Sequence, residues 1–148
     1  VIMPMMRDLF LAVRGEGAYR NGKRLSVSEV AAIDVGRVEI DFSGPGERPA
    51  TMAHVSDLIL RAGNVRCHGA AVVGLCSVAS ADADAFFHVS LSPHDYAAGQ
   101  IIVEEAGGVC TRLDGSPLLL FDNRRGVLAS NGRLHPELVA LGGRESRQ

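Results

Sequence analysis

The chain has 148 residues, of which 47% are hydrophobic and 22% are charged, and this composition excludes a disordered polymer and fits one folded domain. Its 15 basic and 17 acidic side chains leave a formal net charge of -2, which argues against a module that binds nucleic acid through phosphate charge. No apolar run approaches the roughly 20 residues that span a bilayer, so we expect no membrane segment, and three cysteines without metal-type spacing predict reduced thiols in a cytoplasmic protein.

The first part of the chain predicts strands joined by a tight turn. Leu9–Val13 is a short apolar run that ends at Arg14-Gly15, which is typical of a strand. The dipeptide Asn21-Gly22 favours a type I′ hairpin turn, because both residues tolerate a positive φ. Residues 25–28 alternate apolar and polar side chains, so we expect them to form the returning strand.

The segment from 35 to 42 alternates in the same way, which predicts a half-buried strand. Val38 and Ile40 fall on its apolar face, and Glu39 and Asp41 fall on the opposite face. In chain order, the elements predicted after it are a helix over 50–62, a short strand over 64–67, a buried helix over 70–81, a strand over 85–89, a helix over 95–106, strands over 109–112 and 126–130, and a terminal helix over 135–141. This mixed order indicates an α/β or α+β domain built around one sheet.

Asp95 is the most informative single residue. It follows a proline-containing loop and precedes an alanine-rich helix, where an N-cap residue is expected. On local sequence alone, capping is the favoured interpretation. The alternative is a carboxylate held on a rigid helix end, ready to bind a hard cation such as Mg²⁺. One carboxylate makes a poor magnesium site, so other acids or a bound phosphate would have to complete it.

Two further places have a structural and a functional interpretation. Gly69, Ala70 and Ala71 open the predicted buried helix, either as small residues for close packing or as an open helix N-terminus whose amides face a polar ligand. His88 lies at the end of a predicted strand, where a hydrogen-bonded edge histidine is favoured over a catalytic one.

Other polar or glycine-rich segments are assigned to structure. Gly15-Glu16-Gly17 lacks the third glycine of a dinucleotide loop and precedes a hairpin, so it predicts a turn. Glu104-Glu105 at a helix end predicts a solvated face. His94 has no partner at metal-ligand spacing, so packing in a loop is favoured over zinc binding.

Taken together, these segments resemble the inositol monophosphatase family, the Mg²⁺-dependent, lithium-sensitive sugar phosphatases. The most specific match is His94–Gly99, which resembles the family signature W-D-x-A-A-G. Other stretches resemble further family motifs in order and spacing: Ala12–Gly22 (A-x-x-G-x-G-A-x-x-N-G), Arg66–Ala71 (R-x-x-G-[ST]-A-A), Ala81–Ala85 (G-x-x-D-A), Glu105–Gly108 (E-A-G-G) and Ala129–Asn131 (A-S-N).

The resemblance covers the C-terminal half of the family fold. It implies a mixed β-sheet packed against helices, part of the layered sandwich shared by inositol monophosphatases and fructose-1,6-bisphosphatases. Residues 1–28 then correspond to a strand and hairpin remnant of the N-terminal half, and residues 29–148 to the C-terminal α/β domain. The family's N-terminal half carries a Glu-Glu pair and the D-P-[IL]-D-G-T motif, which supply most metal ligands. Neither is in this sequence, so we expect the chain alone to be inactive or nearly so.

The resemblance also assigns roles to individual residues. Asp95 corresponds to a family ligand of Mg²⁺ that lies close to the substrate. Gly69, Ala70 and Ala71 correspond to the segment that lines the sugar pocket, and Ala70 replaces a residue with a hydroxyl group. His88 stands where inositol-specific members have a glutamate that binds a ring hydroxyl, which places myo-inositol 1-phosphate itself in doubt as the substrate.

The implied function is hydrolysis of a sugar or inositol phosphate monoester with Mg²⁺ as cofactor, by a protein of which this chain forms the C-terminal part. Family members usually form homodimers, so a homo-oligomer is expected. The alternative is a non-catalytic binding or dimerisation module derived from the family. Because the two family halves share a buried surface, we also expect this chain to expose an apolar patch.

Overall fold

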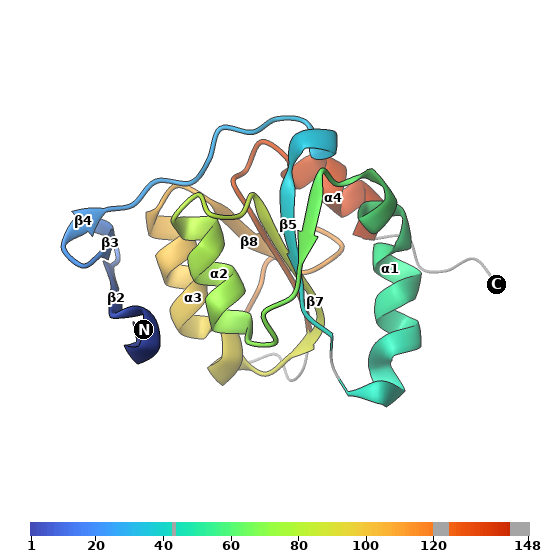
Figure 1. Cartoon of the computed structure of the whole chain (residues 1–148), viewed down its shortest axis with the longest axis horizontal. Coiled ribbons are helices and arrows are strands. Elements are labelled where there is room, and N and C mark those ends of the chain that lie inside the picture. Colours follow the sequence, from blue (N-terminus) through green and yellow to red (C-terminus); the bar gives the residue numbers. More distant parts are fainter. Residues whose placement is uncertain (43, 120–124, 143–148) are drawn as a thin grey trace.

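The computed structural model describes residues 1–42, 44–119 and 125–142, which form two β-sheets with helices packed around the larger one (Figure 1). The larger sheet has the strand order β6-β5-β7-β9-β8. β5 runs parallel to β6 and β7, and β9 runs antiparallel to β7 and β8, so the sheet is mixed, as the sequence predicted. Its strands are β5 (Arg37–Ile40), β6 (Asn64–Arg66), β7 (Ala85–Leu91), β8 (Val109–Thr111) and β9 (Arg125–Ser130).

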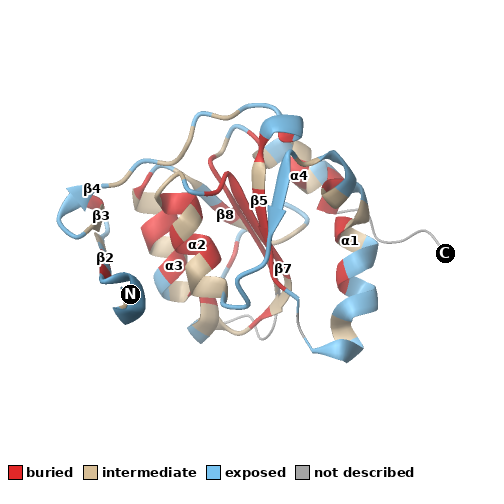
Figure 2. Ribbon diagram, in the orientation of Figure 1, coloured by how far each residue is buried: buried red, intermediate tan, exposed pale blue. Residues whose placement is uncertain are grey.

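Helices cover both faces of the larger sheet. α2 (Ala71–Ala79) and α3 (Pro93–Glu105) lie on one face, and α1 (Arg48–Arg61) and α4 (His135–Gly142) lie on the other (Figure 1). Each face has its own hydrophobic core, and β7 contributes to both, because successive side chains of a strand point to opposite faces. Phe86 is buried in the core with α2 and α3, and Phe87 is buried in the core with α1 and α4. Figure 2 shows the central strands and the inward faces of α2 and α3 as the most buried parts.

The smaller sheet is antiparallel and packs its buried face against α3. Phe10 and Ala18, on its second and third strands, are buried in the same core as α2 and α3. Its other face is open: Ile2, Leu9 and Leu11 are each about half exposed or more, consistent with the apolar patch expected from the sequence. The strands are β1 (Ile2–Met3), β2 (Asp8–Val13), β3 (Gly17–Arg20) and β4 (Lys23–Arg24).

The predicted hairpin turn is confirmed, but the predicted return strand is too long. Asn21 and Gly22 have φ angles of 51° and 80°, as a type I′ turn requires. Residues 25–28 were expected to pair, whereas the strand ends at Arg24 and only the Leu25 amide adds one more bond to the hairpin. The chain then leaves the hairpin and turns toward the end of α3. There the Val27 amide donates a hydrogen bond to the carbonyl of Ala106, 3.1 Å away.

Glu105 anchors the hairpin to α3. Its two carboxylate oxygens accept hydrogen bonds from the amides of Gly15 and Gly17, at 2.8 and 2.9 Å. These bonds lower the pKa of Glu105. The predicted solvated face was therefore wrong for this residue, while Gly15 and Gly17 form the predicted turn with φ angles of 81° and 94°.

The strand predicted over 35–42 is present as β5, which spans Arg37–Ile40, but the prediction that it is half-buried was wrong. Glu39 is 1% exposed and Asp41 is 3% exposed. They are as deeply buried as the apolar Val38 and Ile40, with which they alternate along the chain. β5 lies between β6 and β7 and is covered by helices on both faces, so alternation of polar and apolar residues does not mean a solvent face here. Among the described residues, no helix combines the length and the apolar character that crossing a membrane requires.

Candidate functional site

One cleft of about 580 Å³ gathers every residue that the sequence analysis assigned to a site. Gly69, Ala70, Ala71, His88 and Asp95 all line it, although they come from three separate parts of the chain. The remaining lining residues are Val1, Asp41, Phe42, Gly44, Val72, Ser90, Leu91 and His94.

The topology of the larger sheet explains this convergence. The parallel strands β5, β6 and β7 all end at the same edge, and the chain continues from them into the residues that line the cleft. In open α/β sheets, ligands commonly bind outside the carboxyl ends of the strands. The N-termini of α2 and α3 also lie at this edge, and helix N-termini favour anionic ligands.

The sequence predicted Asp95 at the N-cap of its helix, but Asp95 is the third residue of α3. The helix begins at Pro93, whose fixed φ suits the first helical position, so the N-cap moves back to Ser92. Oδ2 of Asp95 accepts a hydrogen bond from the Ser92 amide at 3.0 Å, the acidic half of a capping box. Oδ1 lies 3.5 Å from Nε2 of the exposed His94. One oxygen therefore caps the helix while the other remains beside the cleft, so capping and ligand binding are compatible.

The N-terminus of α2 forms the facing wall of the cleft. Ala70 is its N-cap residue and offers no side chain that could satisfy the first amides. The first bond of the helix runs from the Val73 amide to the carbonyl of Ala70, at 2.9 Å, so the amides of Ala71 and Val72 point out of the helix entrance. This geometry favours the interpretation of an open helix N-terminus over simple close packing.

His88 lies inside β7, where the sequence predicted a strand end. It is 7% exposed, and its ring stacks on Phe86 with the ring centres 6.5 Å apart. The strand pairing with β9 shifts register after His88, and this irregularity lets the Ser90 amide donate to Nδ1 of His88 at 3.0 Å. Because Nδ1 accepts that bond, the proton of the neutral ring resides on Nε2.

Asp41 is a cleft residue that the sequence analysis missed. Its Oδ1 accepts hydrogen bonds from the amides of His68 and Gly69, at 3.1 and 2.8 Å, and from the thiol of Cys67 at 3.4 Å. The alternating pattern had placed Asp41 away from the core. The available signal was its position just after a strand of a parallel pair, which is where binding residues gather.

The described residues do not make a complete magnesium site. They contain no group of three or more His, Cys, Asp or Glu side chains that could hold a metal ion. Mg²⁺ prefers six oxygen ligands in octahedral geometry. Asp95 offers one oxygen that is not used in capping, which lies beside His94, and Oδ1 of Asp41 already accepts from three donors. Any magnesium held by Asp95 needs most of its ligands from other sources.

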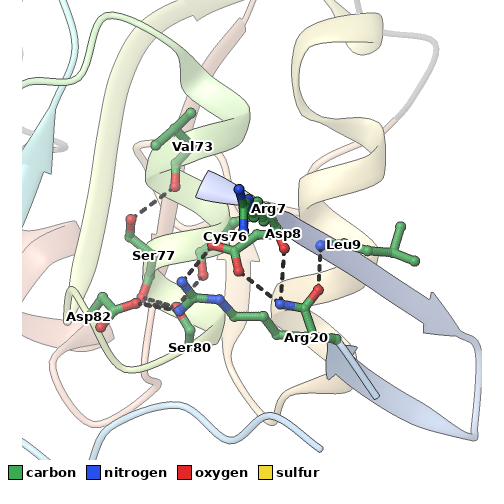
Figure 3. Close-up of polar contacts among 10 residues, drawn as sticks. Arg7, Asp8, Leu9, Arg20, Val73, Cys76, Ser77, Ser80 and Asp82 are labelled. Carbon is green, nitrogen blue, oxygen red and sulfur yellow. Dashed lines mark hydrogen bonds and ion pairs between the residues drawn. The ribbon is translucent and has the colours of Figure 1, made fainter. Parts of the chain in front are cut away.

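A smaller cavity of about 180 Å³ lies between the small sheet and α2. Arg20 reaches across it and contacts Asp8 at 2.5 Å and Asp82 at 3.3 Å (Figure 3). The hydrogen bond from Arg20 lowers the pKa of Asp8. Since this guanidinium pairs with two carboxylates of the chain and lies over the Phe10 ring, 5.5 Å from its centre, we assign the cluster to joining the hairpin with the end of α2.

Comparison with known proteins gives three consistent results. The chain matches the inositol monophosphatase family over residues 1–145. It is 39% identical over 132 residues to the chloroplastic phosphatase IMPL1 of Arabidopsis thaliana, an alignment that covers 88% of this chain and 35% of the relative. It also resembles the solved inositol monophosphatase from Anabaena (Nostoc) sp. PCC 7120, with a TM-score of 0.86, 30% identity, and coverage of 95% of this chain and 56% of that one.

A further solved structure shows a ligand. SaIMPase-II, a staphylococcal protein, has been solved with inositol monophosphate bound, and it matches this chain with a TM-score of 0.85 and 26% identity. The match covers 96% of this chain and 54% of SaIMPase-II. The chain thus spans about half the length, or less, of the relatives that it matches.

Proposed function

Because the chain belongs to the inositol monophosphatase family, we propose that it is the C-terminal part of a Mg²⁺-dependent phosphatase that hydrolyses a sugar or inositol phosphate monoester. One observation carries the proposal: all five residues that the resemblance assigned to substrate or metal line one cleft, between the N-termini of two helices. The inositol monophosphate bound by SaIMPase-II supports the class of ligand.

In this proposal each part of the cleft has a distinct role. The open N-terminus of α2, with Gly69, Ala70 and Ala71, contacts the substrate through backbone groups and its partial positive charge favours an anion. Oδ1 of Asp95 supplies one ligand oxygen to Mg²⁺. When bound, magnesium offsets the negative charge of the phosphate and polarises its oxygens. The other magnesium ligands must come from the phosphate, from water or from protein outside the residues that the structure describes.

His88 bears on the choice of substrate. Histidine replaces here the glutamate that, in inositol-specific members, is expected to accept a hydrogen bond from a ring hydroxyl. We therefore propose that the alcohol portion of the substrate is not recognised at this position through the acidic contact of inositol-specific members.

The alternative is a non-catalytic binding or dimerisation module. We favour an enzyme part over it because the helix N-termini and Asp95 converge on one cleft. We further propose a homo-oligomer in the cytoplasm, and the free thiols of Cys67, Cys76 and Cys110 agree with a reducing compartment.

The test is release of phosphate from a panel of sugar phosphates, with and without Mg²⁺. We expect the product of the complete reading frame that encodes this chain to hydrolyse at least one ester only when Mg²⁺ is present, and the 148-residue chain alone to remain at background. A complete product that binds these esters but hydrolyses none would contradict the proposal and favour the binding module.

A further inference from the structure

Two buried carboxylates, Glu39 in β5 and Asp41 just after it, lie on the side of the sheet toward α2, and Asp41 also lines the cleft. Glu39 and Asp41 are two residues apart and therefore share this face. Oε1 of Glu39 and Oδ2 of Asp41 are buried and have no hydrogen-bond partner among the described residues. Burying such oxygens is unfavourable, and most buried polar atoms in proteins are paired. Their placement therefore calls for an explanation other than packing.

The partners of Asp41 identify what it holds. Three donors converge on its Oδ1, and all come from the consecutive residues Cys67, His68 and Gly69. Two of these donors are backbone amides, so the carboxylate fixes the path of the main chain and not merely a side chain.

Glu39 supports the same loop from a second point. Its Oε2 lies 2.8 Å from Nδ1 of His68, so the loop is bound to β5 through both its backbone and a side chain. The loop ends at Gly69, whose φ of +72° lies in the left-handed region that glycine adopts without steric cost. No atom lies within 4 Å of the position of a Cβ on Gly69, so its conformation is not imposed by crowding.

We infer that Asp41 is a positioning residue, which holds the segment Cys67–Gly69 so that Ala70 and Ala71 present the open N-terminus of α2 to the ligand. This inference deepens the proposed function, on which its ligand-binding part rests. Asp41 does not itself act on the reacting atoms. It determines the shape of the wall that receives the substrate.

The experiment compares three variants, made in the product of the complete reading frame that encodes this chain, by amide hydrogen exchange at single residues and by binding of inositol monophosphate in the presence of Mg²⁺. Asp41→Ala removes the acceptor, and Asp41→Asn retains an oxygen at Oδ1. Ile40→Ala is the matched control, because Ile40 is fully buried on the opposite face of the same strand and touches the other core.

In Asp41→Ala we expect the amides of His68 and Gly69 to exchange about tenfold faster or more, because each loses its hydrogen-bond acceptor. Amides inside α3 should keep their rates, and affinity for inositol monophosphate should fall by a similar factor. Asp41→Asn should recover most of both losses. Ile40→Ala should speed exchange throughout the sheet without singling out this loop.

Unchanged exchange at Gly69 in Asp41→Ala would overturn the inference, and so would a uniform increase like that of the control. Localised faster exchange with unchanged affinity would show that the wall does not position the ligand, and would also overturn it. If the unmodified complete product binds neither inositol monophosphate nor a sugar phosphate, the proposed function is contradicted, while localised exchange rates still support the positioning of the loop by Asp41.

Discussion

The two faces of β5 differ in what they contribute. Val38 and Ile40 point toward α1 and α4, where the core is formed by apolar side chains. Glu39 and Asp41 point the other way and are just as buried, yet their contacts are hydrogen bonds to the loop that lines the cleft. One strand thus packs the domain with one face and shapes a binding site with the other.

The largest change in stability is expected in the apolar core between the larger sheet and helices α1 and α4. Phe87 is 1% exposed in the core with α1 and α4, so Phe87→Ala should lower the free energy of unfolding by about 3–5 kcal/mol. Chemical denaturation measures this change. Leu60 is 83% exposed, and Leu60→Ala is the control that should leave stability nearly unchanged. A loss below about 1 kcal/mol for Phe87→Ala would mean that this core is not tightly packed.

Sequence patterns predicted the apolar face and misread the polar one. The helices and most strands were found because apolar residues recur at helical or alternating spacing. The same rule placed Glu39 and Asp41 in solvent, since a local pattern does not reveal that helices cover both faces of β5. Whether a buried carboxylate has partners depends on contacts between residues 26 to 29 positions apart, which no local pattern contains.

The candidate site was predicted more fully than the contacts that support it. Motif resemblance identified Gly69, Ala70, Ala71, His88 and Asp95, and the structure brings all of them to one cleft. It did not predict that Ser92 caps α3, because a proline at the first helical position moved the helix start two residues before Asp95. The register shift that joins Ser90 to His88 is likewise a property of the paired strands.

A smaller loss of stability is expected on the cleft side, where α2 and α3 touch at Gly99. A Cβ at this position would lie 2.5 Å from Cδ1 and 2.7 Å from Cβ of Leu75. Gly99→Ala should therefore cost about 1–3 kcal/mol through overpacking, partly offset by the helix propensity of alanine. It should also weaken ligand binding, because α3 carries Asp95.

The control for this variant is Gly46→Ala. No atom lies within 4 Å of the Cβ position at Gly46, and its φ is not positive, so thermal unfolding should change little. Equal stability of the Gly99 and Gly46 variants would show that α2 and α3 separate easily and would weaken the contrast between the two faces.

The smallest effect concerns His135, a polar residue at the start of α4, on the side of the sheet where the core is otherwise apolar. Its Nδ1 and Nε2 lie 2.8 Å from Oγ of Ser130 and 2.9 Å from Oγ1 of Thr111. Burial lowers the pKa of His135 below its ordinary value of 6.5. The unfolded chain then binds a proton that the folded chain does not, so stability should fall as the pH drops below 6.5.

His135→Gln should remove this part of the pH dependence, as measured by denaturation between neutral and mildly acidic pH. A variant that loses stability with falling pH as steeply as the unmodified chain would assign the dependence to other groups. Such a result would mean that His135 does not contribute to the pH dependence of stability.

The central claim is that the cleft binds a phosphate monoester with magnesium through Asp95. Calorimetric titration of inositol monophosphate into the product of the complete reading frame and into its Asp95→Asn variant, each with and without Mg²⁺, tests it most directly. Asparagine retains an oxygen that can accept the Ser92 amide, so the fold should persist, while the magnesium-dependent affinity should fall about tenfold or more with loss of the charged ligand. Equal magnesium-dependent affinity in the two proteins would contradict the account and leave Asp95 as a helix cap alone.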